Sequence, residues 1–436
     1  MSGQRPVTDT AAIPHWYDPE SDVPTFVSGD GARVTDEDGA EYLDFIAQLY
    51  CVNVGHGNER IATAMAEQAE RLAYVSSAKH NDTRSRLAAR LADRLPGDLS
   101  SVFFSVSGSE ANESAIQMAR QYTDANTVLT RWRSYHGGTY GAGGLTGDPE
   151  TRGLVERHAA TTGTGKFLPP LPDAFGGATG AELAERAADH LEYVIRNEGP
   201  DTVAAVLTEP VGGTSGGYPA PPGYFERVRE ICDEYDVLLI ADEVITGFGR
   251  CGEWWGVETE ELEPDLLTFA KGVTGGYAPL AGVGVRSDVA ATVREEGFGL
   301  GQTFGGHPVS CAAGLAALDE YESGLVDNAR DVGPYLGERL RTLADHDVVH
   351  SVRGRGLLWS VEFRDPETGE PFVDPRVDPD ADNPVSEVIG EAGDRGVLLG
   401  TGRPNFFLIL SPPLTVGEPE VDEAVDALDG AIEAVF

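Results

Sequence analysis

Short apolar runs alternate with helical stretches through much of this 436-residue chain, and this alternation most constrains its fold. Helical stretches at Glu110–Tyr122 and Tyr224–Tyr235 separate several of the runs. Such alternation is typical of an α/β fold, so we predict a central, mostly parallel sheet. The predicted strands are Val102–Phe104, Val128–Thr130, Ala204–Leu207, Val237–Ile240, Leu266–Phe269 and Gly282–Val285.

The segments before this region predict further elements. The first 25 residues or so are polar and contain prolines, which predicts an arm lying on another surface. Turn signals at Asp30–Gly31 and Asp38–Gly39 predict short strands. Apolar residues then recur at helical spacing from Glu59, and the pattern continues over Ser85–Leu95.

The C-terminal part reads as α+β. A helix from His307 through Tyr321 closes the large domain, a strand follows at Leu357–Phe363, and a last helix begins at Glu420. Residues 364–385, rich in Asp, Pro and Glu, predict a surface insertion. We predict that residues 1–58 form the arm and part of a small domain, residues 59–322 a large domain, and residues 323–436 a C-terminal small domain.

The charge balance is strongly acidic, with 72 Asp and Glu against 32 Lys and Arg and a formal net charge of −40. Such a surface repels nucleic acid and anionic membranes, so neither is expected as a partner. Lysine occurs only at Lys79, Lys166 and Lys271. Dispersed acidic residues with scarce lysine predict a protein from a cytosol rich in salt, where a Debye length of about 3 Å at 1 M screens the repulsion. An ordinary acidic enzyme is the alternative.

The cysteines predict a cytoplasmic protein. Cys51, Cys232, Cys251 and Cys311 lie far apart and predict reduced thiols. The first ten residues lack an apolar signal core, and no apolar run approaches the roughly 20 residues that span a membrane.

Two helix starts could bind an anion. Ser107–Asn112 follows a predicted strand, and Gly108 and Ser109 offer close backbone approach, free N–H groups and a hydroxyl. The alternative for Ser107 and its Glu is a simple helix cap. Gln302–Pro308 offers the hydroxyl of Thr303 in the same way, while its histidine reads as a helix-start residue or, alternatively, a metal ligand.

Three further residues follow strands. Tyr135 could stack on a flat ring or be a buried loop residue. Asp242 ends an apolar strand, where a carboxylate can keep a heteroaromatic nitrogen protonated; with Glu243 it could instead bind a metal, but nothing nearby completes such a site, and we expect none. Lys271 ends the next strand, where burial lowers an amine pKa as Schiff-base chemistry requires; the alternative is a buried ion pair.

The order of these signals resembles the class III aminotransferases, pyridoxal-phosphate (PLP) enzymes of fold type I. The resemblance runs from about Pro24 to the C-terminus, and its most specific part is Asp242–Arg250 followed by Lys271. It implies a seven-stranded, mostly parallel sheet in the large domain. It also implies roles for individual residues: Lys271 holds PLP as a Schiff base and moves the proton, Asp242 pairs with the ring nitrogen, Tyr135 and Val244 cover the ring, Gly108 and Ser109 bind the phosphate, and Glu209 lies beside the cofactor.

The resemblance also implies a homodimer with shared active sites, with a dimer of dimers as the alternative. Thr303 would reach the phosphate of the neighbouring subunit.

Within the family, the chain is most similar to the ω-amino acid and amine:pyruvate aminotransferases, through stretches such as Leu49–Gly57 and Ser411–Leu414. Tyr50 stands where that subgroup often has Trp, at the substrate pocket. Ile409 stands where ornithine and GABA relatives have a carboxylate-binding Arg. Arg403 lies near the movable Arg of the amine:pyruvate enzymes, and Gly400 and Gly402 would allow such movement.

We therefore predict ping-pong transfer of an amino group from an amine or ω-amino acid to a keto acid, with pyruvate expected. A PLP aminomutase, racemase or decarboxylase of the same fold is the alternative. A non-catalytic PLP-fold protein is disfavoured because Lys271, Asp242 and Thr303 are all present.

Overall fold

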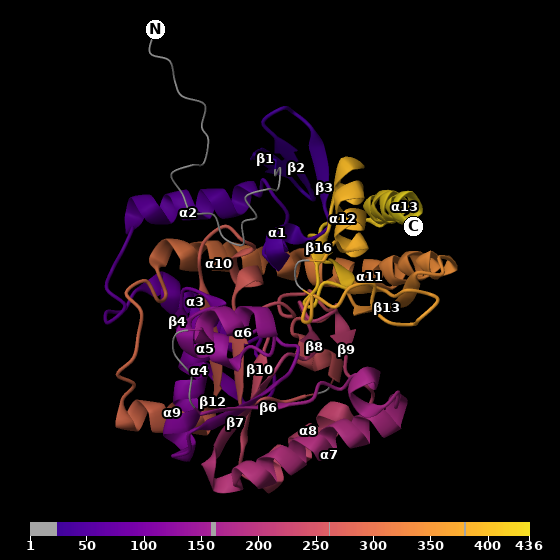
Figure 1. The fold of residues 1–436 in the computed structure, drawn as a ribbon. Helices are drawn as coiled ribbons and strands as arrows, with labels where there is room; N and C mark the ends of the chain where they lie inside the picture. The colour runs from indigo at the N-terminus through magenta and orange to yellow at the C-terminus, as the bar shows by residue number, and fades with distance from the viewer. Residues whose placement is uncertain (1–23, 158–162, 261, 379–380) are drawn as a thin grey trace.

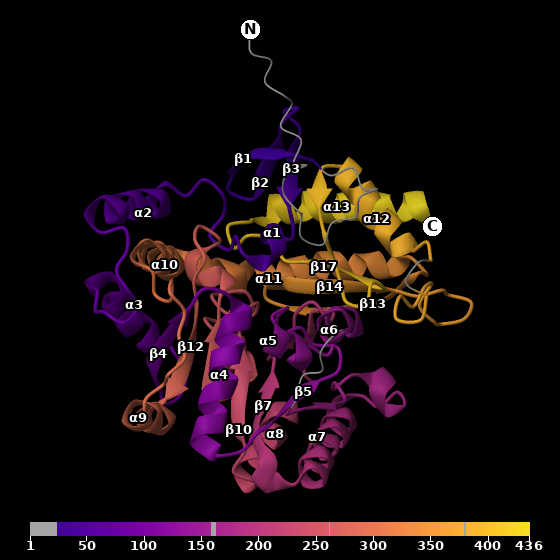
Figure 2. The same ribbon diagram turned by 60° about the vertical axis from the view of Figure 1, so that its left-hand side comes forward.

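The computed structural model describes residues 24–157, 163–260, 262–378 and 381–436, so most of the predicted N-terminal arm lies outside the described residues. A seven-stranded sheet forms the centre of the molecule (Figures 1 and 2). β12 is antiparallel to both of its neighbours, and the other adjacent pairs are parallel. The prediction of an α/β fold with a mostly parallel sheet is thereby confirmed. In spatial order the strands are β4 (Leu99–Ser105), β12 (Ala281–Arg286), β11 (Leu266–Phe269), β10 (Leu238–Asp242), β7 (Val203–Thr208), β5 (Thr127–Arg131) and β6 (Thr164–Phe167).

Alternate residues of the central strands enter two different cores, because successive side chains of a strand point to opposite faces. Leu238 and Ile240 pack in the core that includes α4 (Gly108–Thr123). Leu239, between them, packs in the core that includes α7 (Gly180–Glu198) and α8 (Tyr224–Glu234). The sheet is therefore covered by helices on both faces, which explains why its strands read as continuous apolar runs.

In the described residues, two four-stranded sheets lie beside the central one, and β8 (Val211–Gly212) and β9 (Tyr218–Pro219) form a separate pair. The first contains β1 (Phe26–Asp30), β2 (Arg33–Asp36) and β3 (Glu41–Asp44), with β15 (Val397–Leu398) parallel to β3. The second is built from β13 (Val349–Arg355), β14 (Leu358–Phe363), β17 (Phe407–Leu410) and β16 (Gly400–Thr401). The division into segments at residues 58 and 322 stays a prediction.

The predicted helix from His307 to Tyr321 does not end where the sequence suggests. α10 (Pro308–Glu320) continues through a π-helical turn into α11 (Val326–Arg341), with a kink at Gly324, whose φ is +127°. The remaining elements are α1 (Ala47–Tyr50), α2 (Glu59–Arg71), α3 (Asp82–Ala92), α5 (Tyr140–Leu145), α6 (Pro149–Glu156), α9 (Ser287–Glu296), α12 (Pro384–Asp394), α13 (Glu418–Val435) and five short 3₁₀ turns.

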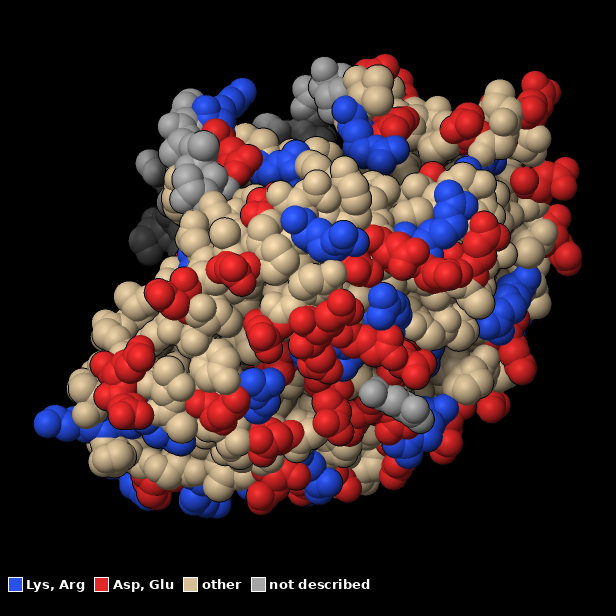
Figure 3. Space-filling view, turned by 90° about the horizontal axis from the view of Figure 1, so that it is seen from below, with Lys and Arg blue, Asp and Glu red and all other residues tan. Residues whose placement is uncertain are grey.

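The excess of acidic residues in the sequence is visible on the surface (Figure 3). Acidic side chains predominate over the face seen in Figure 3, and many of the basic ones lie beside an acidic one. Within the described ranges, no helix is both long and apolar enough to cross a membrane.

Candidate active site

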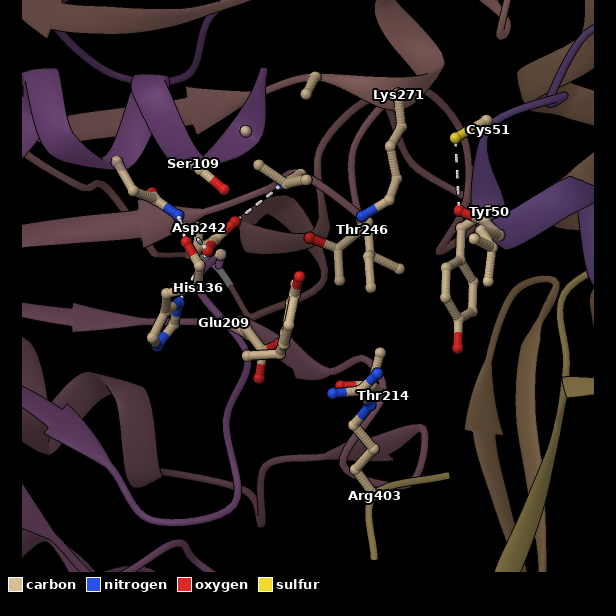
Figure 4. Close-up of a pocket in the computed structure, with 18 of the residues that line it drawn as sticks. Tyr50, Cys51, Ser109, His136, Glu209, Thr214, Asp242, Thr246, Lys271 and Arg403 are labelled. Atoms are coloured by element: carbon tan, nitrogen blue, oxygen red, sulfur yellow. Dashed lines mark hydrogen bonds and ion pairs between the residues drawn. The ribbon is translucent and has the colours of Figure 1, made fainter. Parts of the chain in front are cut away.

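A cavity of about 420 Å³ opens beside the carboxyl ends of the central strands (Figure 4). Ser109, Asp242 and His136 lie on one side of it, Tyr50 and Cys51 on the opposite side, and Lys271 extends between them. Nine of the ten predicted site residues line this cavity: Tyr50, Gly108, Ser109, Tyr135, Glu209, Asp242, Val244, Lys271 and Arg403.

The start of α4 serves as both a capped helix end and a wall of the cavity. Ser107 accepts the Glu110 N–H, and Glu110 in return accepts the Ser107 N–H, so these two form the cap. Gly108 and Ser109 face the cavity instead. A side chain at Gly108 would place its Cβ 2.9 Å from a methyl carbon of Val244, so only glycine fits. The residues that cap α4 and the residues that face the cavity are therefore different members of one motif.

Asp242 is fixed at the end of β10 by three neighbours. Its Oδ2 accepts from Asn112 Nδ2 at 2.9 Å and lies 2.7 Å from His136 Nδ1, and its Oδ1 accepts the Val244 N–H at 3.1 Å. Burial disfavours the ionised carboxylate, but these hydrogen bonds outweigh burial and hold the pKa of Asp242 below its ordinary value. Asp242 is therefore an ionised group facing the cavity.

Two of the residues that hold Asp242, Asn112 and His136, were not assigned roles from the sequence. Asn112 also accepts the Thr268 hydroxyl at 2.8 Å, which ties α4 to β11 behind the carboxylate. Asn112 is a fully buried polar residue between Ala111 and Ala115, which are themselves buried. A polar residue on the apolar face of a helix is a signal that could have revealed it.

Lys271 begins a 3₁₀ turn after β11, with Ala270 between the two elements. Its φ is +43°, a region that non-glycine residues rarely adopt. Its Nζ lies 5.7 Å from the centre of the Tyr50 ring. Burial lowers the pKa of Lys271, partly opposed by the charges of Cys51, Asp242 and Glu209. Among the described residues, none forms an ion pair with this amine, so the predicted alternative of a buried ion pair is not what the structure has.

Glu209 follows β7 and pairs with a buried arginine of β5. Arg131 Nη2 donates to Glu209 Oε2 at 3.2 Å and to its backbone oxygen at 3.0 Å. Burial raises the pKa of Glu209, and the charge of Arg131 opposes this rise. The pair joins two strand ends beneath the cavity.

Tyr50 and its neighbours reach the cavity from a left-handed turn. Ala47, Gln48, Leu49 and Tyr50 all have φ between +45° and +66°. Four consecutive non-glycine residues in this region are costly, because the Cβ of each crowds the backbone. Asp44 supports the turn by accepting the N–H groups of Ile46 and Gln48, both at 3.3 Å.

Arg403 lies at the edge of the cavity, with its Cζ 5.4 Å from the centre of the Tyr135 ring. Its backbone N–H donates to Thr214 O at 2.7 Å. The two glycines before it are explained by packing: a Cβ at Gly400 would lie 2.4 Å from Ile46, and one at Gly402 would overlap the Phe407 ring. The backbone here is held, so any movement of Arg403 belongs to its side chain.

Thr303 is the predicted site residue that the structure does not bring to this cavity. It lies in the exposed turn before α10, where its carbonyl accepts the Tyr74 hydroxyl at 3.0 Å. Its assignment to a neighbouring subunit stays a prediction.

Glu243 and Arg250, in the Asp242–Arg250 segment, form hydrogen bonds to other parts of the chain. Glu243 accepts the N–H groups of Gly256 and Val257 at 2.8 and 2.7 Å. Arg250 donates to Leu357 O, Pro412 O and Asn53 Oδ1, at 3.1, 2.5 and 2.6 Å, which joins three distant segments. These contacts were not predicted, because they depend on where the loops pack.

Comparison with known proteins identifies the family. A model described as aminotransferase class III matches residues 17–432. The chain is 41% identical over 415 residues to a probable aminotransferase of Mycobacterium tuberculosis, which covers 92% of this chain and 87% of that protein. A thermostable (S)-enantioselective ω-transaminase from Thermomicrobium roseum superposes with a TM-score of 0.90 at 35% identity over 97% of each chain. The taurine:2-oxoglutarate aminotransferase from Bifidobacterium kashiwanohense, solved with PLP and glutamate, gives 0.91 at 32% identity, with 97% and 95% of the chains covered.

A strand-end lysine, a strand-end carboxylate and a helix N-terminus around one cavity define a PLP-dependent enzyme of fold type I. The chain belongs to the class III aminotransferases, and its cofactor is PLP. The residues present fit this cofactor. Asp242 is an ionised carboxylate and Lys271 a buried amine. The position of Gly108, at the start of α4, has no space for a side chain.

Proposed function

We propose that this aminotransferase moves an amino group from an amine or ω-amino acid to pyruvate by a ping-pong mechanism. The observation that carries the proposal is the make-up of the cavity wall. Of the described residues that line it, Arg403 is the one arginine and Lys271 the one lysine, and Tyr50, Val211 and Ile245 offer apolar surface. One arginine suits an acceptor with one carboxylate, and the apolar surface suits the side chain of an amine.

The chain's own residues have distinct tasks in this reaction. Bound PLP withdraws electrons from the substrate carbon, which makes the proton on that carbon removable. The amine of Lys271, with its pKa lowered by burial, would take this proton at Nζ and pass it to the C4′ carbon of the bound cofactor. Asp242, held ionised, would keep a proton on the ring nitrogen of the bound cofactor. Arg403 binds the carboxylate of the keto acid.

Position 409 supports a keto acid with a single carboxylate. Ile409 lies on β17, fully buried in an apolar cluster with Ile46 and Phe407, and carries no charge. A second carboxylate, as in 2-oxoglutarate, would need a second cation, because an unpaired buried charge costs several kcal/mol. The Bifidobacterium relative is named for 2-oxoglutarate, which makes this acid the competing acceptor to test.

The test is a screen of both half-reactions. The purified yellow enzyme is mixed with a panel of amines and ω-amino acids, and conversion to the pyridoxamine form is followed by absorbance. The pyridoxamine form is then mixed with pyruvate or 2-oxoglutarate. Pyruvate is expected to restore the yellow form at least ten times more efficiently; a preference for 2-oxoglutarate contradicts the proposed acceptor.

The same screen addresses the alternative reactions of this fold. An aminomutase, racemase or decarboxylase does not pass the amino group to a free keto acid. Failure of every keto acid to restore the yellow form would therefore favour one of them over transamination.

We propose that the protein is a homodimer in which Thr303 completes the phosphate site of the second subunit. Phe304 beside it is 56% exposed, and Tyr74 and Leu300 are 41% and 55% exposed, so large hydrophobic side chains are exposed at and near this turn. Light scattering is expected to give twice the chain mass, or four times for a dimer of dimers. A monomer that holds PLP and is fully active contradicts the proposal.

We further propose a cytoplasmic location. It is supported by the four cysteines, which are free thiols and are buried except for Cys51. Localisation of a tagged chain by cell fractionation tests it.

A further inference from the structure

The corner between α5 and α6 carries a buried carboxylate that no part of the proposed reaction uses. Asp148 is only 5% exposed, and it caps α6 by accepting the Thr151 N–H on Oδ2 at 3.0 Å. The same oxygen lies 3.3 Å from Arg403 Nη1, across 255 positions of sequence. Arg403 Nη1 also donates to the Thr151 hydroxyl at 2.5 Å.

In these contacts the carboxylate of Asp148 balances the positive charge of the Arg403 guanidinium at the rim of the cavity. The side chain of Arg403 is 25% exposed and that of Asp148 7%, so the pair is partly screened from water. Tyr135 provides an aromatic face 5.4 Å from Cζ. In this arrangement the described residues that line the cavity present no unpaired arginine charge to an uncarboxylated amine.

We infer that Asp148 is a positioning residue that competes with the substrate's carboxylate for Arg403 and thereby sets the balance between carboxylated and uncarboxylated substrates. The inference rests on the proposed role of Arg403. A keto acid must displace Asp148 before it can pair with Arg403, so its apparent affinity is reduced by the fraction of Arg403 that Asp148 holds. An uncarboxylated amine leaves the pair intact.

Asp148→Asn is a sharp test, because it removes the charge and keeps the helix cap. Asparagine caps helices as well as aspartate does. In this chain Asn58, Asn81 and Asn383 already cap α2, α3 and α12. Thr151→Val is a second variant that removes only the hydroxyl acceptor, in case the first one disturbs α6.

The main readout is equilibrium binding of propionate, which has a carboxylate but neither an amine nor a keto group. Calorimetric titration of the PLP form is expected to give a Kd about 10-fold lower in Asp148→Asn, and a smaller decrease in Thr151→Val. In the pyruvate half-reaction KM is expected to fall by a similar factor, with kcat little changed. With 2-butylamine KM is expected to stay the same or to rise.

Two controls separate the possible failures. Asp319, on α10, is one of two carboxylates that pair with Arg90, at 2.7 Å. Asp319→Asn is expected to leave propionate binding unchanged. Arg403→Ala is expected to weaken propionate binding and to slow the pyruvate half-reaction by roughly 10²-fold. If Arg403→Ala changes neither, the proposed role of Arg403 fails. If Arg403→Ala behaves as expected but Asp148→Asn leaves propionate binding unchanged or weaker, the inference about Asp148 is wrong.

Discussion

Lys271 and Asp242 both depend on neighbouring residues for their ionisation states. Lys271 is a buried amine whose pKa is lowered by burial, and it lies two residues after the end of β11 in a strained conformation. Asp242 is a buried carboxylate whose pKa stays low because three donors surround it. Changes at these two positions therefore have different consequences.

The first prediction concerns Lys271→Ala. The variant is expected to lose the absorbance of lysine-bound PLP and to turn over no amine, because no other amine lines the cavity among the described residues. Borohydride reduction followed by peptide mapping checks this. A covalent PLP adduct on Lys79 or Lys166 in the variant would mean that the assignment is wrong.

The second prediction concerns Asp242→Asn. The neutral amide keeps the size of the side chain, so the variant is expected to retain PLP. Its kcat is also expected to fall by roughly 10²-fold or more, because a neutral amide no longer keeps the ring nitrogen of PLP protonated. PLP content by absorbance and kcat with one amine are the measurements, and wild-type turnover would remove Asp242 from the mechanism.

At the scale of residues, the sequence was most informative where local structure fixes position. Asp242 and Lys271 each end an apolar run, and a strand that ends there must deliver the side chain to the carboxyl edge of the sheet. Asp148 and Arg131 could not be assigned this way. Their partners, Arg403 and Glu209, lie far away in sequence, and only the packing of loops brings each pair together.

Among the elements, the left-handed turn of α1 carries a third prediction. Asp44→Ala removes the acceptor for two N–H groups of this strained turn. The turn is expected to relax and to displace Tyr50, so that KM for the amine rises about 10-fold while PLP absorbance is retained, since each lost buried hydrogen bond costs about 1–3 kcal/mol.

A matched control for this change exists one strand earlier. Asp36 accepts the N–H groups of Asp38 and Ala40 in the turn between β2 and β3, at 3.0 and 2.8 Å. Asp36→Ala is expected to lower stability without raising KM. Equal effects of the two substitutions on KM would show that Asp44 acts only through stability.

A fourth prediction concerns Lys166 on β6. Its amine donates to Gly144 O and Leu145 O, at the end of α5, and to the Thr130 hydroxyl. Burial lowers the pKa of Lys166 to about 7, whereas an unfolded chain has a lysine pKa of about 10.4. Between these values the unfolded state binds the extra proton, so this group's contribution to stability rises with pH across the window and is least favourable below pH 7.

Urea unfolding at pH 7.5 and 9.5 tests the sign. The free energy of unfolding of the wild type, relative to Lys166→Met, is expected to increase with pH by at most ~1.4 kcal/mol per pH unit. The same substitution at exposed Lys79 is the control, expected to show no such slope. A difference between wild type and Lys166→Met that does not change with pH contradicts the prediction.

The elements were predicted where their apolar pattern is strong. All six predicted strands of the central sheet are present, and the resemblance alone implied a seventh. That strand, β6, has the sequence Thr-Gly-Lys-Phe with one buried apolar residue, so periodicity could not reveal it. The left-handed turn of α1 was also missed, because no glycine marks it and its stability comes from Asp44.

At the scale of the whole molecule, the net charge of −40 carries the fifth prediction. Salt weakens exposed ion pairs, but each of these contributes only about 0–1 kcal/mol. Repulsion among the surplus acidic residues acts over the whole surface, and its screening is expected to dominate. The melting temperature is therefore expected to rise from dilute buffer towards molar KCl; a flat or falling curve contradicts adaptation to salt.

The strand that completes the N-terminal sheet comes from the opposite end of the chain. β15 pairs with β3, and Leu43 N–H donates to Gly396 O at 2.7 Å. A ribosome releases β3 first, so this edge has no partner until residues 396–398 emerge. Tyr50, which follows β3 by only a few residues, reaches its final place equally late. Nascent chains stopped before residue 396 would carry an open strand edge, a template for association with other chains.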